Sequence, residues 1–401
     1  MNKTLRNEYM PDTVSAPGET LSEMLEDRGM TQQDLALRIG MAPKTINEII
    51  KGKAPLTHDT ALALERILGV SASFWNRLEA SYQESLARQR DRERLAQAAE
   101  WLHGFPIKEM IAKSYLRGRD TVTEQAEELL RFLRVASPVE WDLRALTVQG
   151  YYRHCKTQVS DPNALGVWLQ RGENIARALE CAPFDAVRFQ QTLQTLRGCT
   201  FDTQADFLPK LVQMCQECGV AVALVPALPK ASACGFTRWL SPHKALLQLS
   251  DRYKRADIFW FSFFHEAGHI LKHGRREEFL ELERGREVNA KEQEADRFAS
   301  DLLIPPAFYR RIEQDTPYSR VKIERWSEQL GIAPGIIVGR LRHEKALPQT
   351  HLTEMLTSID LTAFAVGQTK EKEPPKTIAE LFEGRIGGVH GGGRAWSEDV
   401  E

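Results

Sequence analysis

Apolar residues between positions 18 and 79 recur at intervals of three and four in five short runs, the spacing of short amphipathic helices. Most runs are opened by a capping residue and closed by glycine or proline. Thr31 and Asp34 resemble a capping box with Asp in the usual Glu position, and Gly40 ends that second run. The pattern predicts an all-α domain over residues 15–80. Its inward-facing residues are expected to be Leu21, Met24, Leu25, Ile46, Ile49 and Ile50.

Helical spacing continues through residues 81–214, which we interpret as a helical connecting region. The charged run from Ser85 to Glu100 predicts a solvent-exposed helix that extends the fifth run. Cys215 and Cys218 have CxxC spacing, but no second CxxC follows, so we interpret them as the buried end of a helix. The aromatic residues expected in the core of this region are Trp141, Trp168 and Phe189.

The pattern changes after Gly219 to three β-rich runs, at 220–225, 234–239 and 245–249. Helical segments follow at 257–272, 291–303, 319–330 and 335–343, which complete the ordered part. We therefore expect an α+β domain over residues 215–345, in a chain that is mainly α with a small β-sheet. From residue 366 the sequence is charged and then rich in glycine, which predicts a disordered tail over 366–401.

Composition narrows the class of protein. The 53 Lys and Arg nearly balance 55 Asp and Glu, for a formal net charge of −2, so any contact with nucleic acid must be local. The longest apolar stretch, near residues 220–228, contains Pro226 and falls short of the roughly 18 residues that span a bilayer. The N-terminus lacks the apolar core of a signal peptide, and six Cys are too few for a disulfide scaffold. We expect a cytoplasmic protein with no membrane partner.

Residues 31–51 follow the order helix, glycine turn, helix, which matches a helix-turn-helix whose second helix enters the major groove of DNA. Three Lys against one Glu between Met41 and Ala54 give this segment a local charge of +2. Polar side chains here would contact base edges and phosphates. The expected DNA-binding residues are Gln32, Gln33, Lys44, Thr45, Asn47, Glu48, Lys51 and Lys53. The alternative is a helical module that binds protein.

The segment His265-Glu266-Ala267-Gly268-His269 is an HExxH motif on a predicted helix. Residues four apart share one face of a helix, so the two imidazoles can converge on a Zn²⁺ ion, with Glu266 beside them as a general base. His273 lies one turn further along. His273 or Tyr253 would supply an oxyanion donor, and spacing does not decide between them.

The next predicted helix offers three carboxylates, at positions 292, 294 and 296. Glu292 and Asp296 are four residues apart and share a face, so Glu292 can complete the metal site while Asp296 accepts a hydrogen bond from a ligating histidine. Glu294 falls on another face. We therefore expect Glu292 as the third metal ligand and Asp296 as its supporting residue.

The runs HEAGHILKHG and EQEADRFASDLLIP resemble the ImmA/IrrE family of zinc metallopeptidases over roughly residues 215–345. In that family a small sheet precedes the HExxH helix, so the resemblance implies a zincin-like fold. Carried over by position, it implies His265, His269 and Glu292 as Zn²⁺ ligands and Glu266 as the catalytic base of peptide-bond hydrolysis.

The runs APGETLSEMLEDRGMTQQDLA, INEIIKGK and SASFWNRL resemble the Cro/C1-type helix-turn-helix and are close to the HigA group of addiction-module antidotes. That resemblance implies binding to double-stranded operator DNA, usually as a homodimer, and repression of the protein's own promoter. Ala42 departs from the pattern because a Ser or Thr helix cap is expected there, and the missing cap costs about 1 kcal/mol.

Two hypotheses of function follow from these motifs. In the first, the chain is a DNA-binding regulator with a zinc metalloendopeptidase domain that cleaves a partner protein, either a repressor or a toxin. In the second, it is an antitoxin and autorepressor whose peptidase-like domain senses or binds a partner without hydrolysis.

Overall fold

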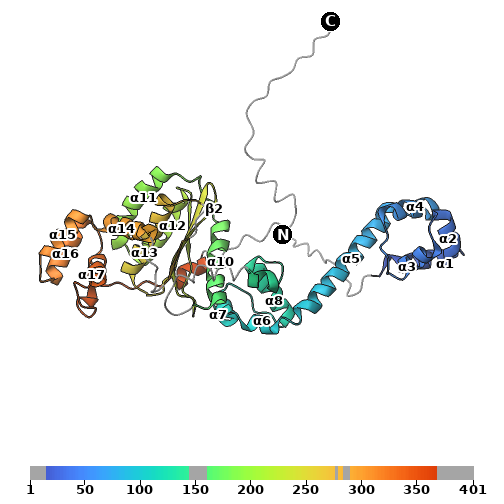
Figure 1. The fold of residues 1–401 in the computed structure, drawn as a ribbon, viewed down its shortest axis with the longest axis horizontal. Helices are drawn as coiled ribbons and strands as arrows, with labels where there is room; N and C mark the ends of the chain where they lie inside the picture. The colour runs from blue at the N-terminus through green and yellow to red at the C-terminus, as the bar shows by residue number, and fades with distance from the viewer. Residues whose placement is uncertain (1–14, 144–159, 276–278, 283–289, 368–401) are drawn as a thin grey trace, which may run out of the picture. The chain divides into compact units, whose positions relative to one another are not determined.

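The computed structural model describes residues 15–143, 160–275, 279–282 and 290–367 (Figure 1). These residues form two compact units. One consists of residues 15–100 with 120–126, and the other of residues 101–119 with the described residues from 127 onward. Within these ranges, no helix combines the length and the apolar character needed to cross a membrane.

The first unit is all-α, as predicted. Thr31 accepts a hydrogen bond from the Asp34 amide at 3.1 Å, which confirms the capping interaction, and Gly40 ends the second helix with a φ of 79°. Ala42 provides no side-chain cap, and Pro43 occupies the first turn of the third helix. The helices are α1 (Pro17–Asp27), α2 (Gln32–Ile39), α3 (Pro43–Ile50), α4 (His58–Leu68) and α5 (Ala72–Leu95).

A small apolar core holds these five helices together. Gly18 allows α1 to approach α3 closely, because a Cβ at this position would lie 2.2 Å from the Ile49 carbonyl oxygen. Met24 and Ile50, both expected inside, are only half-buried at the edge of the core. The fully inward residues include Leu21, Leu25, Leu35, Ile46, Ile49, Leu64 and Trp75.

The predicted connecting helix over residues 85–100 is wrong in one detail. The fifth helix runs without a break to Leu95 and stops there, and a separate helix, α6 (Ala99–His103), begins after a turn. Leu95 and Ala98 are both buried, so the turn places these apolar side chains inward. A helix that continued the charged pattern would leave this apolar surface unpacked. Most residues between 87 and 94 are exposed, as expected for the charged run.

The second unit begins with further helices. Trp141, Trp168 and Phe189 are buried, as predicted. The Cys218 thiol lies 3.2 Å from the Thr192 hydroxyl, and burial raises the pKa of Cys215 well above its usual value, so both cysteines are packed thiols. The helices, after α6, are α7 (Ile107–Ala112), α8 (Val122–Leu133), α10 (Pro162–Ala178), α11 (Ala186–Gly198), the 3₁₀ turn η1 (Cys199–Phe201) and α12 (Gln204–Gln216).

A mixed sheet of four strands follows, in the order β1-β3-β2-β4. The strands are β1 (Val220–Leu224), β2 (Ala233–Ser241), β3 (Lys244–Leu249) and β4 (Phe279–Leu282). The first runs parallel to β3, and β2 runs antiparallel to both β3 and β4. Three strands match the prediction, and β4 was not predicted.

Helices cover both faces of this sheet (Figure 1). On one face, α10 packs across the strands, and Gln248 of β3 donates a hydrogen bond to the Trp168 carbonyl at 2.7 Å. On the other face lie α12 and a long apolar helix, α13 (Ala256–Lys272). The α13 aromatics Trp260 and Phe263 are buried in the core that this face shares.

The C-terminal helices pack beyond α13. They are α14 (Ala290–Leu303), α15 (Pro306–Gln314), α16 (Arg320–Leu330), α17 (Pro334–His343), η2 (Thr353–Met355) and α18 (Thr362–Gly367). Helices α14, α16 and α17 each lie within one residue of a predicted segment. Helix α15, which has Pro306 in its first turn, was not predicted, and neither were η2 and α18. The predicted disordered tail lies outside the described residues, except that 366–367 end α18.

Candidate functional site

Helix α13 carries the HExxH motif inside the second unit. The helix is apolar on nearly every side, so it is buried along most of its length. His265 and Glu266 have no exposed surface, and His269 is 2% exposed. The motif is thus held rigidly between the sheet and the C-terminal helices.

Three side chains converge where α13 meets α14. The Nε2 atoms of His265 and His269 lie 2.9 Å apart. The two carboxylate oxygens of Glu292 each lie 3.4 Å from one of these nitrogens. Among the described residues, these three form the group that could hold a metal ion, with ligand atoms all within 4.8 Å of one another.

Each histidine has a partner on its other ring nitrogen. The Asp296 carboxylate lies 2.9 Å from Nδ1 of His265. Nδ1 of His269 lies 2.9 Å from Nδ1 of His273, whose Nε2 is 3.5 Å from a carboxylate oxygen of Glu294. His273 therefore stands behind His269, on the side away from the converging Nε2 atoms, and this geometry does not favour it as an oxyanion donor.

Glu266 points toward the sheet. A Cβ built on Gly235 of β2 would lie 2.4 Å from its Oε1 atom, so the carboxylate packs directly against the strand backbone. The hydroxyl of Thr237, two residues along β2, donates to the Glu266 backbone carbonyl at 3.4 Å. Glu266 fits here because Gly235 has no side chain.

The donor set fits a zinc ion. An ionised Asp296 carboxylate can only accept a hydrogen bond, so a proton on Nδ1 of His265 would face it and leave the lone pair at Nε2 for a metal ion. With His269 presenting Nε2 at 2.9 Å, two ring nitrogens and a carboxylate surround one point in a buried site. Two imidazoles and one carboxylate are a common catalytic zinc set.

Sequence reasoning missed two residues of this site. Gly235 lies 31 positions before Glu266, and no local spacing signals that the two meet. His273 was considered only for the reacting face, although its spacing of four from His269 signals a shared helix face. Tyr253 lies apart from the converging atoms, where it lines a neighbouring cavity and is 40% exposed.

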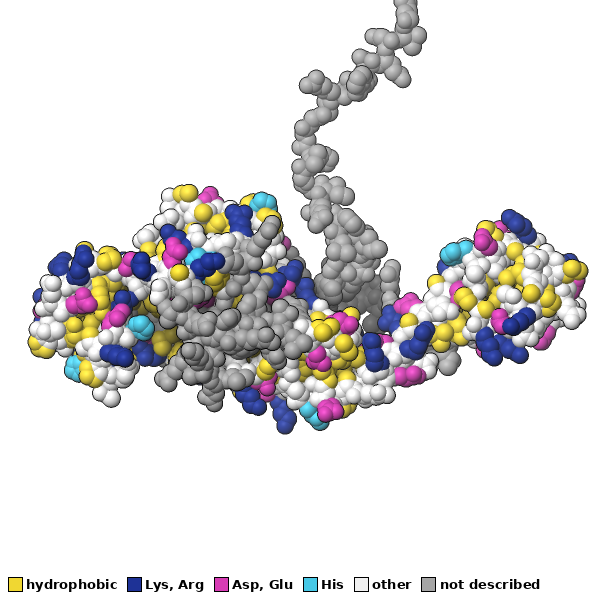
Figure 2. Space-filling view, viewed as in Figure 1, with side chains coloured by type: hydrophobic (Ala, Val, Ile, Leu, Met, Phe, Trp, Pro, Cys, Tyr) yellow, Lys and Arg dark blue, Asp and Glu magenta, His cyan; other side chains and the backbone are white. Residues whose placement is uncertain are grey.

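The first unit presents the predicted DNA-binding residues on α2, α3 and the turn that follows. Lys44 is 85% exposed at the start of α3 and lies 3.8 Å from Glu48. Figure 2 shows basic and acidic side chains interspersed over the visible face of this unit. The remaining residues divide into exposed Gln33, Lys51 and Lys53 and half-buried Gln32, Thr45, Asn47 and Glu48.

Two family models match the chain. Residues 21–75 match a helix-turn-helix model, and residues 234–342 match the IrrE N-terminal-like domain of the M78 peptidases. The second range contains both the HExxH motif and Glu292. Peptidases of this type are typically metal-dependent, which agrees with the converging histidine and glutamate side chains.

Individual relatives match the N-terminal part. Virulence-associated protein I of Dichelobacter nodosus is 36% identical over 74 residues, which are 18% of this chain and 68% of that protein. The uncharacterised HTH-type transcriptional regulator YddM of Escherichia coli K12 is 30% identical over 63 residues, 16% of this chain and 67% of that protein. The solved structure of Pseudomonas aeruginosa antitoxin HigA with the higBA promoter is 26% identical, covers 20% of this chain and 90% of that chain, and has a TM-score of 0.20.

These matches agree with the fold and the motifs already described. The two relatives match residues of the first unit over about two thirds of their own length, and the peptidase-type model matches residues of the second unit. The chain therefore belongs to the Cro/C1-type helix-turn-helix family through its N-terminal domain and carries an IrrE N-terminal-like domain of the M78 peptidase type toward its C-terminus.

Proposed function

We propose that this protein is a DNA-binding transcription regulator whose C-terminal domain is a zinc metallopeptidase that hydrolyses a peptide bond in a partner protein. The observation that carries the proposal is the convergence of His265, His269 and Glu292 beside a buried glutamate. The same chain also contains a helix-turn-helix domain, which supports action on a partner in transcription regulation.

His265, His269 and Glu292 would hold the zinc ion. When bound, zinc polarises a carbonyl group and acidifies water. Asp296 fixes the ring of His265, and His273 fixes that of His269. In the proposed reaction, Glu266 takes a proton from the water that attacks the scissile carbonyl carbon. It then delivers that proton to the amide nitrogen as the C–N bond breaks.

Replacing Glu266 tests this mechanism. The full chain is loaded with zinc and incubated with the proteins encoded by neighbouring genes, and cleavage is followed by mass spectrometry. We expect Glu266→Gln to bind zinc like the wild type but to cleave about 100-fold or more slowly, because the side chain no longer accepts a proton. Glu328→Gln, the same change on the exposed surface of α16, is the control.

The outcomes separate the two hypotheses. Full activity of Glu266→Gln would contradict the proposed role of the glutamate. A zinc-loaded wild type that binds a co-encoded protein without cleaving it would instead favour an antitoxin and autorepressor with a sensing or partner-binding domain.

We further propose that the first unit binds operator DNA, as a homodimer on a palindromic site, with α3 in the major groove. Exposed Gln33 would contact base edges, and exposed Lys51 and Lys53 would contact phosphates. The half-buried Thr45 and Asn47 lie on the same helix as Lys44 and would add contacts at closer approach.

Gln33→Ala and Lys53→Ala should affect DNA binding differently. The first should reduce the preference for the protein's own promoter over unrelated DNA by about tenfold, because it removes a base contact. The second should weaken binding to both DNAs and reduce the salt dependence. Fluorescence anisotropy across a salt series measures both, with Gln89→Ala on the exposed face of α5 as the control. A wild type without promoter preference would indicate a protein-binding module.

A further inference from the structure

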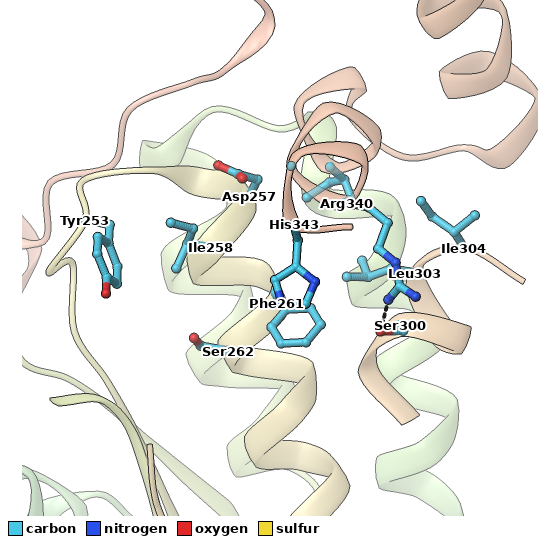
Figure 3. A pocket seen from close by; sticks show the side chains of 12 residues that line it. Tyr253, Asp257, Ile258, Phe261, Ser262, Ser300, Leu303, Ile304, Arg340 and His343 are labelled. Atoms are coloured by element: carbon cyan, nitrogen blue, oxygen red, sulfur yellow. Dashed lines mark hydrogen bonds between the residues drawn. The ribbon is translucent and has the colours of Figure 1, made fainter. Parts of the chain in front are cut away.

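A cavity of about 270 Å³ opens in the second unit among α13, α14 and α17 (Figure 3). Five apolar side chains form most of its wall: Ile258, Phe261, Leu303, Ile304 and Ile336. Seven further residues complete the lining, with polar side chains at several points and one glycine: Tyr253, Asp257, Ser262, Ser300, Gly339, Arg340 and His343.

This cavity lies about one helical turn from the proposed metal site. On α13, Phe261 lies four residues before His265, and their rings are 6.3 Å apart. On α14, Ser300 lies four residues after Asp296. Four residues of helix correspond to about 6 Å, so the cavity begins roughly one turn from the converging ligand atoms. An extended peptide advances about 3.3 Å per residue, so a side chain near the cleaved bond can reach it.

The charged groups in the wall already have partners. The Arg340 guanidinium donates to the Ser300 hydroxyl and lies 2.8 Å from Glu344. The Asp257 carboxylate accepts from the Arg255 guanidinium at 3.0 Å and 2.5 Å. A ligand charge would have to compete with these pairs, so the cavity is suited to an uncharged apolar group.

Two polar atoms of the lining residues, the Ser262 hydroxyl and Nε of Arg340, make no hydrogen bond among the described residues, and only the first belongs to an uncharged side chain. Ser262 is 3% exposed, and its hydroxyl makes no hydrogen bond there. The residue lines the cavity between Tyr253 and Phe261 (Figure 3). A buried hydroxyl without a partner costs free energy, and a ligand carbonyl could accept its hydrogen bond.

We propose that this cavity binds one bulky apolar side chain of a peptide, next to the bond that the metal site acts on, with a backbone carbonyl accepting from Ser262. The proposal rests on the proposed peptidase function, because it assigns the occupant of a cavity beside that site. It makes the partner protein one that carries a leucine-like residue close to its cleavage point.

Direct binding of short peptides tests the proposal without requiring hydrolysis. The probes are the blocked peptides acetyl-Gly-Leu-Gly-amide, acetyl-Gly-Gly-Gly-amide and acetyl-Gly-Asp-Gly-amide, together with isovalerate as a free anion. Their binding to the zinc-loaded full-length Glu266→Gln chain is measured by ligand-observed NMR. We expect the leucine peptide to bind at least tenfold more tightly than the other three probes. Equal binding of the glycine peptide, no binding of the leucine peptide, or preference for isovalerate would overturn the proposal.

Cavity variants locate the bound side chain. Ile258 is partly exposed, so Ile258→Trp should fill the cavity with little packing cost and weaken leucine-peptide binding tenfold or more. Ser262→Ala should weaken it about fivefold, because one hydrogen bond is lost. Val321→Trp, which adds the same bulk at an exposed site on α16, should leave binding unchanged. Leucine-peptide binding that survives Ile258→Trp would place the ligand elsewhere and refute the assignment.

Failure of this proposal and failure of the proposed function give different results. If the wild type cleaves a co-encoded protein but shows no preference for the leucine peptide, only the assignment of the cavity is contradicted. Suppose instead that the leucine peptide binds, that Ile258→Trp abolishes this binding, and that the wild type cleaves nothing. This result supports the assignment of the cavity and contradicts the proposed peptidase function.

Discussion

Each histidine of the proposed metal site has a different kind of partner on its other ring nitrogen. A carboxylate, Asp296, faces Nδ1 of His265, whereas a second imidazole, His273, faces Nδ1 of His269. The ring of Phe279 in β4 stacks on the ring of His269, with centroids 3.9 Å apart, and lies beside the ring of His273. The ring of His269 is thus oriented by an imidazole and an aromatic ring, whereas that of His265 is oriented by a carboxylate.

His273→Ala should weaken zinc binding 10- to 100-fold, the usual effect of removing a residue that orients a metal-ligating histidine. Competition with a chromophoric chelator measures the zinc affinity independently of peptide hydrolysis. His273→Gln should recover most of the affinity, because its amide can still hydrogen-bond to His269. His103→Ala, which removes an exposed histidine on α6, serves as the control. An unchanged zinc affinity in His273→Ala would contradict this role.

Residues that follow helical periodicity could be predicted from the sequence, and residues that meet through the fold could not. His265, His269, Glu292 and Asp296 stand at spacings of four on two helices, so their faces follow from the sequence alone. The positions of these side chains in the structure agree with that expectation, although the roles of three as metal ligands and of Asp296 as their support stay predictions. The contact of Gly235 with Glu266 depends on how β2 packs on α13, which no local pattern specifies.

At the scale of elements, one arginine joins three helices. Arg197 of α11 donates from Nε to the Leu302 carbonyl at 2.8 Å, from Nη2 to the Leu303 carbonyl at 2.9 Å, and from Nη1 to the Leu330 carbonyl at 2.7 Å. These carbonyls end α14 and α16, where a cation also complements the negative end of the helix dipole. Burial lowers the pKa of Arg197, but this arginine stays charged at neutral pH.

Arg197→Ala should lower the free energy of unfolding by about 3 kcal/mol, because several charge-assisted hydrogen bonds are lost and buried carbonyls remain without donors. Urea denaturation followed by circular dichroism measures the change. Arg188→Ala on the same helix removes an exposed pair with Glu217 and should cost no more than about 1 kcal/mol. Equal losses in the two variants would show that Arg197 does not anchor these helix ends.

The elements that the sequence pattern missed are short or start at proline. Only four residues form β4, within a charged stretch, and its edge position needs β2 as a partner. Helix α15 starts at Pro306, soon after the predicted helical segment over residues 291–303 ends, and this proline occupies the first turn of the new helix. Long apolar runs such as α13 and β1 were predicted because burial on all sides leaves a strong signal.

At the scale of the whole molecule, the two proposed activities rest on separate cores. The core of the first unit is built from α1 to α5, and its members include Leu35 and Trp75. The core of the second unit, which contains the proposed metal site, includes residues of the sheet, α13 and α17. All three converging side chains come from α13 and α14. A near-neutral chain can therefore contain a locally basic DNA-binding segment and a carboxylate-containing metal site.

Removal of metal should accordingly affect one unit only. A chelator should lower the unfolding temperature of the second unit, because zinc at about 1,000 times its dissociation constant stabilises the bound fold by roughly 4 kcal/mol. The first unit should keep its unfolding temperature and its affinity for promoter DNA. Differential scanning calorimetry and anisotropy, each with and without chelator, measure these quantities. A tenfold fall in DNA affinity on chelation would contradict the separation.

Because Gly235 has no side chain, the position of the Glu266 carboxylate is sensitive to a single mutation. A glycine codon becomes an alanine codon by one base change, and the added methyl group would displace the Glu266 carboxylate while leaving the two histidines and Glu292 in place. On the proposed function, one base change would therefore separate a form that hydrolyses its partner from a form that holds the metal and only binds the partner.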